Sequence, residues 1–187
     1  MPERYFIALV PPQAVQAEAR TVQQEFVDRY DSRAALKSPP HITLQPPFAW
    51  SDAELPRLAQ ALEAIAARQP LVPVTLSGFG AFVPRVIYIN VVRSPELLAI
   101  QAALLIHLQT TLGLVDRVSQ TRPFAPHLTV GFRDLSQQNF QKAWTEFQSR
   151  PFEATFTIAQ LTLLRHNGQR WQIHTEFPLK GSEATPH

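Results

Sequence analysis

The chain has 187 residues, which is enough for one domain with a substantial hydrophobic core. Its net charge is only +2 at pH 7, which permits an anionic ligand but does not indicate a long nucleic-acid-binding surface. The sequence contains no cysteine, which excludes disulfides and thiolate metal sites and favours a reducing compartment. No apolar run approaches the length of a membrane span, and the first four residues do not resemble a signal peptide, so we expect a cytoplasmic monomer with no membrane partner.

In the first half of the chain, the residue pattern predicts two strands and two helices. Apolar residues spaced by three and four after Gln13 are typical of an amphipathic helix. Ser51, with Glu54 three residues later, is typical of a capped helix start. The expected elements are a strand at 4–10, a helix from 13 to about 31, a strand at 41–44 that ends at Pro46-Pro47, and a helix from 51 to about 68.

The second half of the chain repeats this alternation of strands and helices. Ser94 is a candidate N-cap for a helix that ends near Gly113, and Asn167-Gly168 is a strong hairpin turn signal. The expected elements are a strand pair at 72–82 and 85–92 joined near Val83-Pro84, a helix at 94–112, a strand at 126–130, a helix at 136–150, a hairpin of 152–165 with 170–179, and a flexible tail at 181–187.

Neighbouring strand pairs and the terminal hairpin favour antiparallel sheets, and therefore an α+β fold. Two short histidine motifs lie 86 residues apart (127 − 41), which is close to half of the chain. We therefore expect a bilobal molecule with two pseudo-symmetric lobes, each an antiparallel sheet flanked by helices, around a central cleft. Residues 1–180 would form this single bilobal domain.

The two motifs are Pro40-His41-Ile42-Thr43-Leu44 and Pro126-His127-Leu128-Thr129-Val130. Side chains alternate between the two faces of a strand, so the histidine and threonine of each motif share one face and the apolar residues take the other. One face would carry an imidazole beside a hydroxyl, while the other would anchor it to the core. Two imidazoles that face one another can act as base and acid on one substrate.

The surroundings of both motifs favour a phosphate ligand over a metal or a serine nucleophile. No Asp or Glu occurs in residues 32–51 or 117–133, although metal sites usually need carboxylates or a third histidine. Neither a Gly-x-Ser-x-Gly elbow nor a glycine-rich phosphate loop is present. Hydroxyl donors and nearby cations suit an anion, and the candidate cations are Lys37, Arg85, Arg122 and Arg133. We expect no metal and no cofactor.

Other residues carry weaker predictions. Arg85 is a candidate for phosphate or ribose binding. Several aromatic residues can either stack on a nucleobase or pack in the core, namely Phe48, Trp50, Phe82 and Phe124. His107 is expected at the edge of the core, and His166 and His174 are not expected to be catalytic. If one phosphate fits between the motif histidines, their reactive nitrogens should lie roughly 5–8 Å apart.

The paired Pro-His-x-Thr motifs resemble those of the 2H phosphoesterases, specifically the 2′-5′ RNA ligase-like branch. The resemblance extends to Arg4–Pro12, 84–88, 122–127 and 161–179, and so covers nearly the whole chain. It implies a bilobal α+β domain that hydrolyses 2′,3′-cyclic phosphates of RNA ends or small nucleotides without a metal. The expected product is a 2′-phosphate, and the reverse reaction would be a 2′-5′ ligation. The resemblance also implies that His41 is the proton donor, His127 the base, and Thr43 and Thr129 the phosphate-binding hydroxyls.

Two alternatives remain open from the sequence. The chain could be a binding module that holds RNA ends or nucleotides without turning them over. It could also be a 2H enzyme for a cyclic phosphodiester other than RNA, because residues 45–50, Gln-Pro-Pro-Phe-Ala-Trp, depart from the Phe-Leu-Gly-like continuation common after the first motif in bacterial members of this branch.

Overall fold

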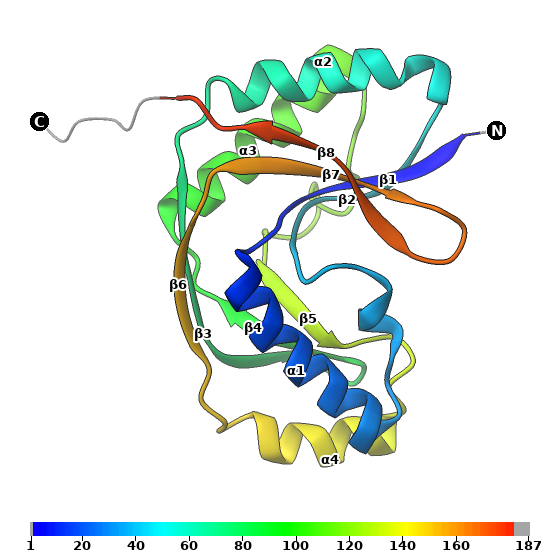
Figure 1. Ribbon diagram of the computed structural model, residues 1–187, viewed down its shortest axis with the longest axis vertical. Helices are drawn as coiled ribbons and strands as arrows, with labels where there is room; N and C mark the ends of the chain where they lie inside the picture. The colour runs from blue at the N-terminus through cyan, green and yellow to red at the C-terminus, as the bar shows by residue number, and fades with distance from the viewer. Residues whose placement is uncertain (1, 182–187) are drawn as a thin grey trace, which may run out of the picture.

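Alternating apolar residues build two antiparallel sheets in the computed structural model, which describes residues 2–181 (Figure 1). Sheet A has the strand order β2 (Ile42–Trp50), β1 (Glu3–Leu9), β7 (Gln160–His166) and β8 (Trp171–Pro178). Sheet B has the order β5 (His127–Gly131), β4 (Val86–Val91), β3 (Val72–Phe82) and β6 (Glu153–Ile158). The helices are α1 (Gln13–Tyr30), α2 (Leu55–Ala66), α3 (Pro95–Leu112) and α4 (Gln137–Phe147), with short 3-10 helices η1 (Ala34–Lys37) and η2 (Asp52–Glu54). The predicted α+β fold with two antiparallel lobes is confirmed.

The two strands that carry the histidine motifs occupy equivalent places in the two sheets. Strand β2 is an edge strand of sheet A, and β5 is an edge strand of sheet B. Residues of β2 and β5 contact one another, so the two motif strands lie where the lobes meet. The pseudo-symmetry predicted from the spacing of the motifs therefore places both histidines at one junction.

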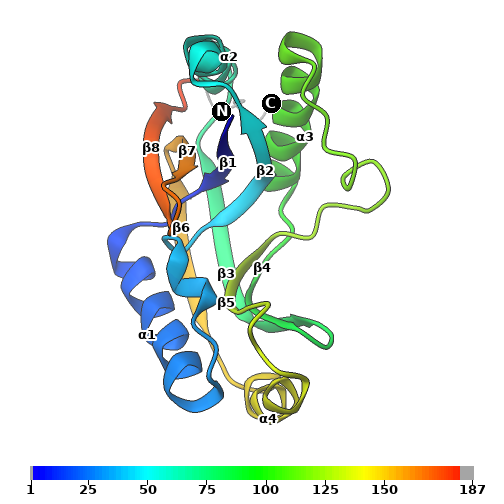
Figure 2. The same ribbon diagram turned by 90° about the vertical axis from the view of Figure 1, so that its right-hand side faces the viewer.

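The helices exchange places between the lobes. Helix α1 follows strand β1 of sheet A but packs against β5 of sheet B, while α3 packs against α2, β2 and β3 (Figures 1 and 2). Buried residues of both sheets consequently form one continuous core. Because this core is shared, neither lobe can move freely without disturbing the packing of the other.

Helix α1 shows how closely its apolar stripe fits the neighbouring sheet. The apolar residues spaced by three and four after Gln13 are all buried, namely Val15, Ala19, Val22, Phe26 and Tyr30. A Cβ atom at Gly131 of β5 would lie only 2.6 Å from the Phe26 ring, so only glycine leaves room for this ring. Helix α3 begins and ends as expected, because the Ser94 hydroxyl accepts a hydrogen bond from the Leu97 amide and Gly113 has the left-handed φ of 67°.

The expectation that β2 ends at Pro46-Pro47 is wrong, because the strand continues to Trp50. Tyr5 pairs with Phe48 and Ile7 pairs with Gln45, so both prolines lie opposite the single residue Phe6. This is a β-bulge, which needs no regular hydrogen bond from the inserted residues. Prolines are tolerated at bulges and in edge strands for that reason.

The expected strand at 152–165 is also wrong, because it is two strands in different sheets. Strand β6 pairs with β3, and after Ala159 strand β7 pairs with β1. The β-branched and apolar residues continue without a turn signal, so only the pairing of the strands shows that the chain passes from sheet B to sheet A. The second predicted helix begins later than Ser51, since the Ser51 hydroxyl caps η2 at the Ala53 amide and α2 starts at Leu55.

At the C-terminal end, the amide of Gly181 donates a hydrogen bond to the Gln69 carbonyl. The rest of the predicted tail, residues 182–187, lies outside the described residues. No helix within residues 2–181 is both long enough and apolar enough to cross a membrane.

One buried hydroxyl provides a test of the packing of sheet A. Thr162 of β7 is fully buried, and its hydroxyl has no hydrogen-bond partner among residues 2–181. An unpaired buried polar group is unfavourable, so Thr162→Val should stabilise the fold by about 1 kcal/mol and raise Tm by roughly 2–4 °C. Thr145→Val on the exposed face of α4 is the matched control and should change Tm little. A lower Tm for Thr162→Val would show that its hydroxyl is stabilising.

Candidate active site

Each motif histidine is fixed by the backbone just before it. His41 immediately precedes β2 and His127 opens β5. The Nδ1 atom of His41 lies 2.7 Å from the Pro39 carbonyl oxygen, and that of His127 lies 2.7 Å from the Ala125 carbonyl oxygen. A carbonyl only accepts, so Nδ1 carries the proton and donates it, which leaves Nε2 for a ligand.

The proline of each motif explains how this hydrogen bond arises. Both accepting carbonyls belong to the residue that precedes a proline, Pro40 or Pro126. A residue before proline is restricted to extended backbone conformations. That restriction helps to hold its carbonyl group toward the histidine ring two residues later. The same local device therefore orients both imidazoles.

The predicted alternation within the motifs is confirmed. Ile42 and Leu44 are buried in the core, whereas Thr43 is partly exposed. The second motif repeats this arrangement, with Leu128 and Val130 buried and Thr129 partly exposed. The buried residues anchor each strand, so the histidine and threonine are presented on the opposite face.

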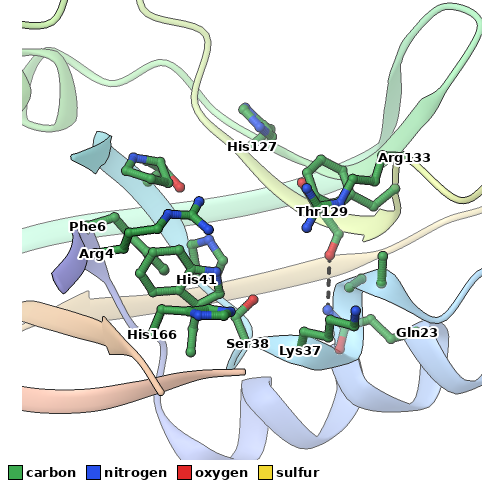
Figure 3. A pocket seen from close by; sticks show the side chains of 16 residues that line it. Arg4, Phe6, Gln23, Lys37, Ser38, His41, His127, Thr129, Arg133 and His166 are labelled. Atoms are coloured by element: carbon green, nitrogen blue, oxygen red, sulfur yellow. Dashed lines mark hydrogen bonds between the residues drawn. The ribbon is translucent and has the colours of Figure 1, made fainter. Parts of the chain in front are cut away.

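Both histidines and both threonines line one cavity of about 210 Å³. Figure 3 shows His41 and His127 reaching this cavity from different strands, with Thr129 beside it. The sequence-based expectation of a shared cleft is therefore confirmed. The separation of 5–8 Å between their reactive nitrogens stays a prediction.

The walls of the cavity are cationic. Arg4, Lys37 and Arg133 also line it, and none of the lining residues within the described chain is Asp or Glu. Coulomb attraction in such a pocket favours an anion and disfavours a cation. Within residues 2–181 there is also no group of three or more His, Asp or Glu side chains that could hold a metal.

Aromatic rings pack around both imidazoles. The ring centroids of Phe6 and His41 are 4.7 Å apart, and the Phe6 ring in turn meets the ring of Trp171 edge-on at 4.7 Å. His127 lies 4.8 Å from Phe82 and 5.3 Å from Tyr88. These contacts restrict the rotamers of the imidazoles and remove water from one side of each ring.

Tyr88 owes its place beside His127 to a glycine on the neighbouring strand. Gly80 of β3 is paired with Tyr88 of β4, and a Cβ atom at Gly80 would lie 2.4 Å from the tyrosine ring. A larger residue at position 80 would therefore displace the ring that packs on His127.

Burial controls the protonation of the two histidines. The pKa of His41 falls from 6.5 to about 4, mainly because the ring is buried; the Pro39 carbonyl opposes this shift, and interactions with His127 and Arg20 contribute to it. Burial also lowers the pKa of His127, while its hydrogen bond to the Ala125 carbonyl opposes this shift. Both imidazoles are therefore neutral at pH 7 in the free protein, with Nε2 available to accept a proton.

A buried glutamine fixes the second motif strand to helix α1. The Gln23 side-chain amide donates a 3.0 Å hydrogen bond to the Thr129 carbonyl, and its own oxygen accepts one from Arg20. Gln23 is only 2% exposed, so this contact is shielded from water. This hydrogen bond connects the backbone of Thr129 to helix α1 and restrains its position.

Not all of the candidate ligand-binding residues reach the cavity. Lys37 and Arg133 line it, but Arg85 lies in an adjacent hollow, which Arg133 and Asp134 also line. Phe48 and Phe124 pack against the core, and Phe82 contacts His127 without lining the cavity. Trp50 also packs against the core, and Arg122 is exposed in the segment between α3 and β5.

Several residues that line the cavity are not predicted from the sequence, among them Arg4, Phe6, Phe132 and Trp171. Arg4 and Phe6 share a strand face by their spacing of two, which is a usable signal, but nothing in the sequence indicated that Trp171 of the last hairpin reaches the cleft. His107 lies at the edge of the core as expected, where its Nε2 contacts the Ala61 carbonyl. His166 lines the cavity, and burial together with nearby cations lowers its pKa.

The shifted pKa of His41 predicts a pH dependence of stability. The pKa falls from 6.5 in the unfolded chain to about 4 in the folded protein, so the unfolded chain binds more protons between these values. The free energy of unfolding should therefore decrease as the pH falls from about 6.5 to about 4, and His41→Gln should weaken this dependence. Denaturation at several pH values, with NMR titration of the His41 ring, checks both. A His41 resonance that titrates near pH 6.5 would contradict the prediction.

Comparison with known proteins agrees with this geometry. The family model described as the 2′-5′ RNA ligase superfamily matches residues 11–170. A protein of Geobacillus kaustophilus named "Putative phosphoesterase" is 31% identical over 185 residues, which is 97% of this chain and 99% of the relative. A protein of Bacillus cereus (strain B4264) with the same description is 29% identical over 177 residues, 92% of this chain and 95% of the relative.

Solved structures show the same fold. TT0787 of Thermus thermophilus has a TM-score of 0.66 at 18% identity, covering 96% of this chain and 100% of that one. LigT of E. coli, in a complex with 3′-AMP, has a TM-score of 0.64 at 22% identity, covering 96% and 99%. Since the family model spans most of the chain and both of its histidine motifs, the chain belongs to the 2′-5′ RNA ligase superfamily, the 2H phosphoesterases.

Proposed function

We propose that this protein is a cyclic phosphodiesterase that hydrolyses 2′,3′-cyclic phosphates of RNA ends or nucleotides to 2′-phosphates. The observation that carries the proposal is the pair of equivalent His-Thr units, which line one cavity with cationic walls. The complex of E. coli LigT with 3′-AMP, a protein of the same fold, supports a ligand that combines ribose and phosphate.

The chemistry follows from the available atoms. Thr43 and Thr129 donate hydrogen bonds to the non-bridging phosphate oxygens. Nε2 of His127 removes a proton from water as the water oxygen forms a bond to phosphorus. The bond from phosphorus to the ribose 3′ oxygen breaks, and this oxygen takes a proton from Nε2 of His41. The product is a ribose with a 2′-phosphate and a free 3′-hydroxyl.

His41 must become protonated when the substrate binds. Burial favours the neutral imidazole in the free protein, but a phosphate anion beside Nε2 favours the charged form. Substrate binding would therefore raise the pKa of His41 and bring about its protonation. This coupling predicts a bell-shaped pH profile, because the reaction needs a neutral His127 and a protonated His41 at once.

Substitution of either histidine tests the proposal. His41→Ala and His127→Ala should each lower kcat by roughly 10²–10⁴-fold, because each removes one proton transfer. Thr43→Val and Thr129→Val should lower kcat/KM less, by roughly ten-fold each, because each removes one hydrogen bond to the phosphate. Phosphorus NMR with adenosine 2′,3′-cyclic phosphate follows both the loss of the ring and the position of the product phosphate.

The control is His174→Ala, which removes an exposed imidazole of β8 that does not line the cavity. This variant should retain full activity, and a chelator should not inhibit the native protein. Tight binding of the cyclic nucleotide without turnover would favour a binding module. Activity that is lost with chelator and restored by a divalent metal would reject the mechanism.

A further inference from the structure

Three cations line the cavity wall without forming an ion pair within the described chain, namely Arg4, Lys37 and Arg133, and the last two are brought together by one connection between distant segments. Lys37 ends the short helix η1, and Arg133 follows strand β5. Neither forms an ion pair with another residue in 2–181, whereas Arg29, Arg150 and Arg165 each pair with two carboxylates. Figure 3 shows Lys37 and Arg133 near Thr129 at the cavity.

Asp134, which follows Arg133 in the sequence, forms hydrogen bonds with residues at the start of η1. Asp134 accepts hydrogen bonds from the Ser32 hydroxyl at 2.7 Å and from the amides of Arg33 and Ala34 at 2.8 and 2.9 Å. The Ser32 hydroxyl is itself buried and also accepts a hydrogen bond from the Phe132 amide. Asp134 therefore ties the start of η1 to the end of β5, and it forms no ion pair with Arg133.

This connection has a geometric consequence. It joins the segment that carries Lys37 to the segment that carries Arg133, although they are nearly one hundred residues apart in sequence. The two positive charges are consequently held at one cavity, where both also act to lower the pKa of His166. Like charges held together without an anion are unfavourable, and a bound anion removes that cost.

The reacting phosphate does not account for both cations. A 2′,3′-cyclic phosphodiester carries a single negative charge, and under the proposed function it already has two imidazoles and two hydroxyls as partners. On a nucleotide, the next anionic group is a phosphate on the 5′ oxygen of the same ribose. In an RNA strand, this group is the phosphodiester that links the terminal nucleotide to the preceding one.

We propose that Lys37 and Arg133 form a second phosphate subsite, which binds the 5′ phosphate of the nucleotide whose cyclic phosphate lies between His41 and His127. This inference rests on the proposed function and narrows its substrate class. The protein would then prefer the end of an RNA chain, or a 5′-phosphorylated nucleotide, over a nucleoside 2′,3′-cyclic phosphate. Lysine and arginine are the usual partners of phosphate groups, and arginine can bind two oxygens at once.

Three substrates test the subsite: adenosine 2′,3′-cyclic phosphate, its 5′-phosphorylated form, and a diadenosine dinucleotide that ends in the cyclic phosphate. The native protein should show a kcat/KM about ten-fold higher for the last two, mainly through KM. In the double variant Lys37→Met/Arg133→Met this preference should fall to about one. The salt dependence of kcat/KM for the 5′-phosphorylated substrates should also become shallower.

Two control variants separate charge at the subsite from charge elsewhere. Lys142→Met removes an exposed lysine of α4 that does not line the cavity, and it should keep the preference. Lys37→Arg retains the charge and should also keep it. Equal kcat/KM for all three substrates in the native protein, or a preference that persists in the double variant, would overturn the subsite. A preference for the dinucleotide alone would assign the contact to the second nucleoside and would equally overturn it.

Calorimetry distinguishes a failure of the proposed function from a failure of the phosphate subsite. If the native protein hydrolyses none of the three substrates, the affinities of adenosine 2′-phosphate and adenosine 2′,5′-bisphosphate are compared directly. Tighter binding of the bisphosphate that disappears in the double variant would support the subsite in the absence of turnover. Equal affinities would reject it.

Discussion

The hydrogen bond from each imidazole Nδ1 to the carbonyl two residues earlier is the constraint on which the site depends. It fixes the ring, selects the tautomer and leaves Nε2 for the ligand. Proline at 40 and 126 supports it by restricting the preceding residue to an extended backbone. This hydrogen bond involves only neighbouring residues, so it does not depend on contacts between the lobes. One short motif can therefore occur twice with the same geometry.

The fold brings the two copies together by placing both motif strands at sheet edges. An edge strand is hydrogen-bonded on one side only, and proteins must protect the open side. Here the two edge strands contact one another, and helices α1 and α3 pack against β5 and β2. The shared core then fixes the cleft in place, because close-packed interiors resist displacement of either sheet. Gln23 adds a direct tie from α1 to the Thr129 carbonyl.

The electrostatics of the cavity couple ligand binding to protonation. Burial lowers the pKa of His41, His127 and His166, and nearby cations contribute to the shifts of His41 and His166. A phosphate anion opposes these shifts, because its negative charge compensates the cations and favours a charged histidine. Asp134 follows Arg133 in the sequence, but its carboxylate accepts hydrogen bonds from two backbone amides and from Ser32 and forms no ion pair with Arg133. The site is thus prepared for an anion at the expense of repulsion in the free state.

The sequence by itself determined the motif strands, the buried residues behind them, the two-lobed α+β fold and a phosphate-type ligand, because these follow from strand periodicity and the local absence of carboxylates. Tertiary structure alone decided the rest of the cavity wall. Trp171 and Arg4 reach the cavity beside His41 through the pairing of β1, β7 and β8, and Lys37 meets Arg133 through Ser32 and Asp134. Strand β2 continues through Pro46-Pro47 because both prolines lie in a bulge opposite Phe6. Strands β6 and β7 are separate because β6 pairs with β3 in one sheet and β7 pairs with β1 in the other. Contacts between residues far apart in the chain leave no periodic signal, whereas burial along one strand does.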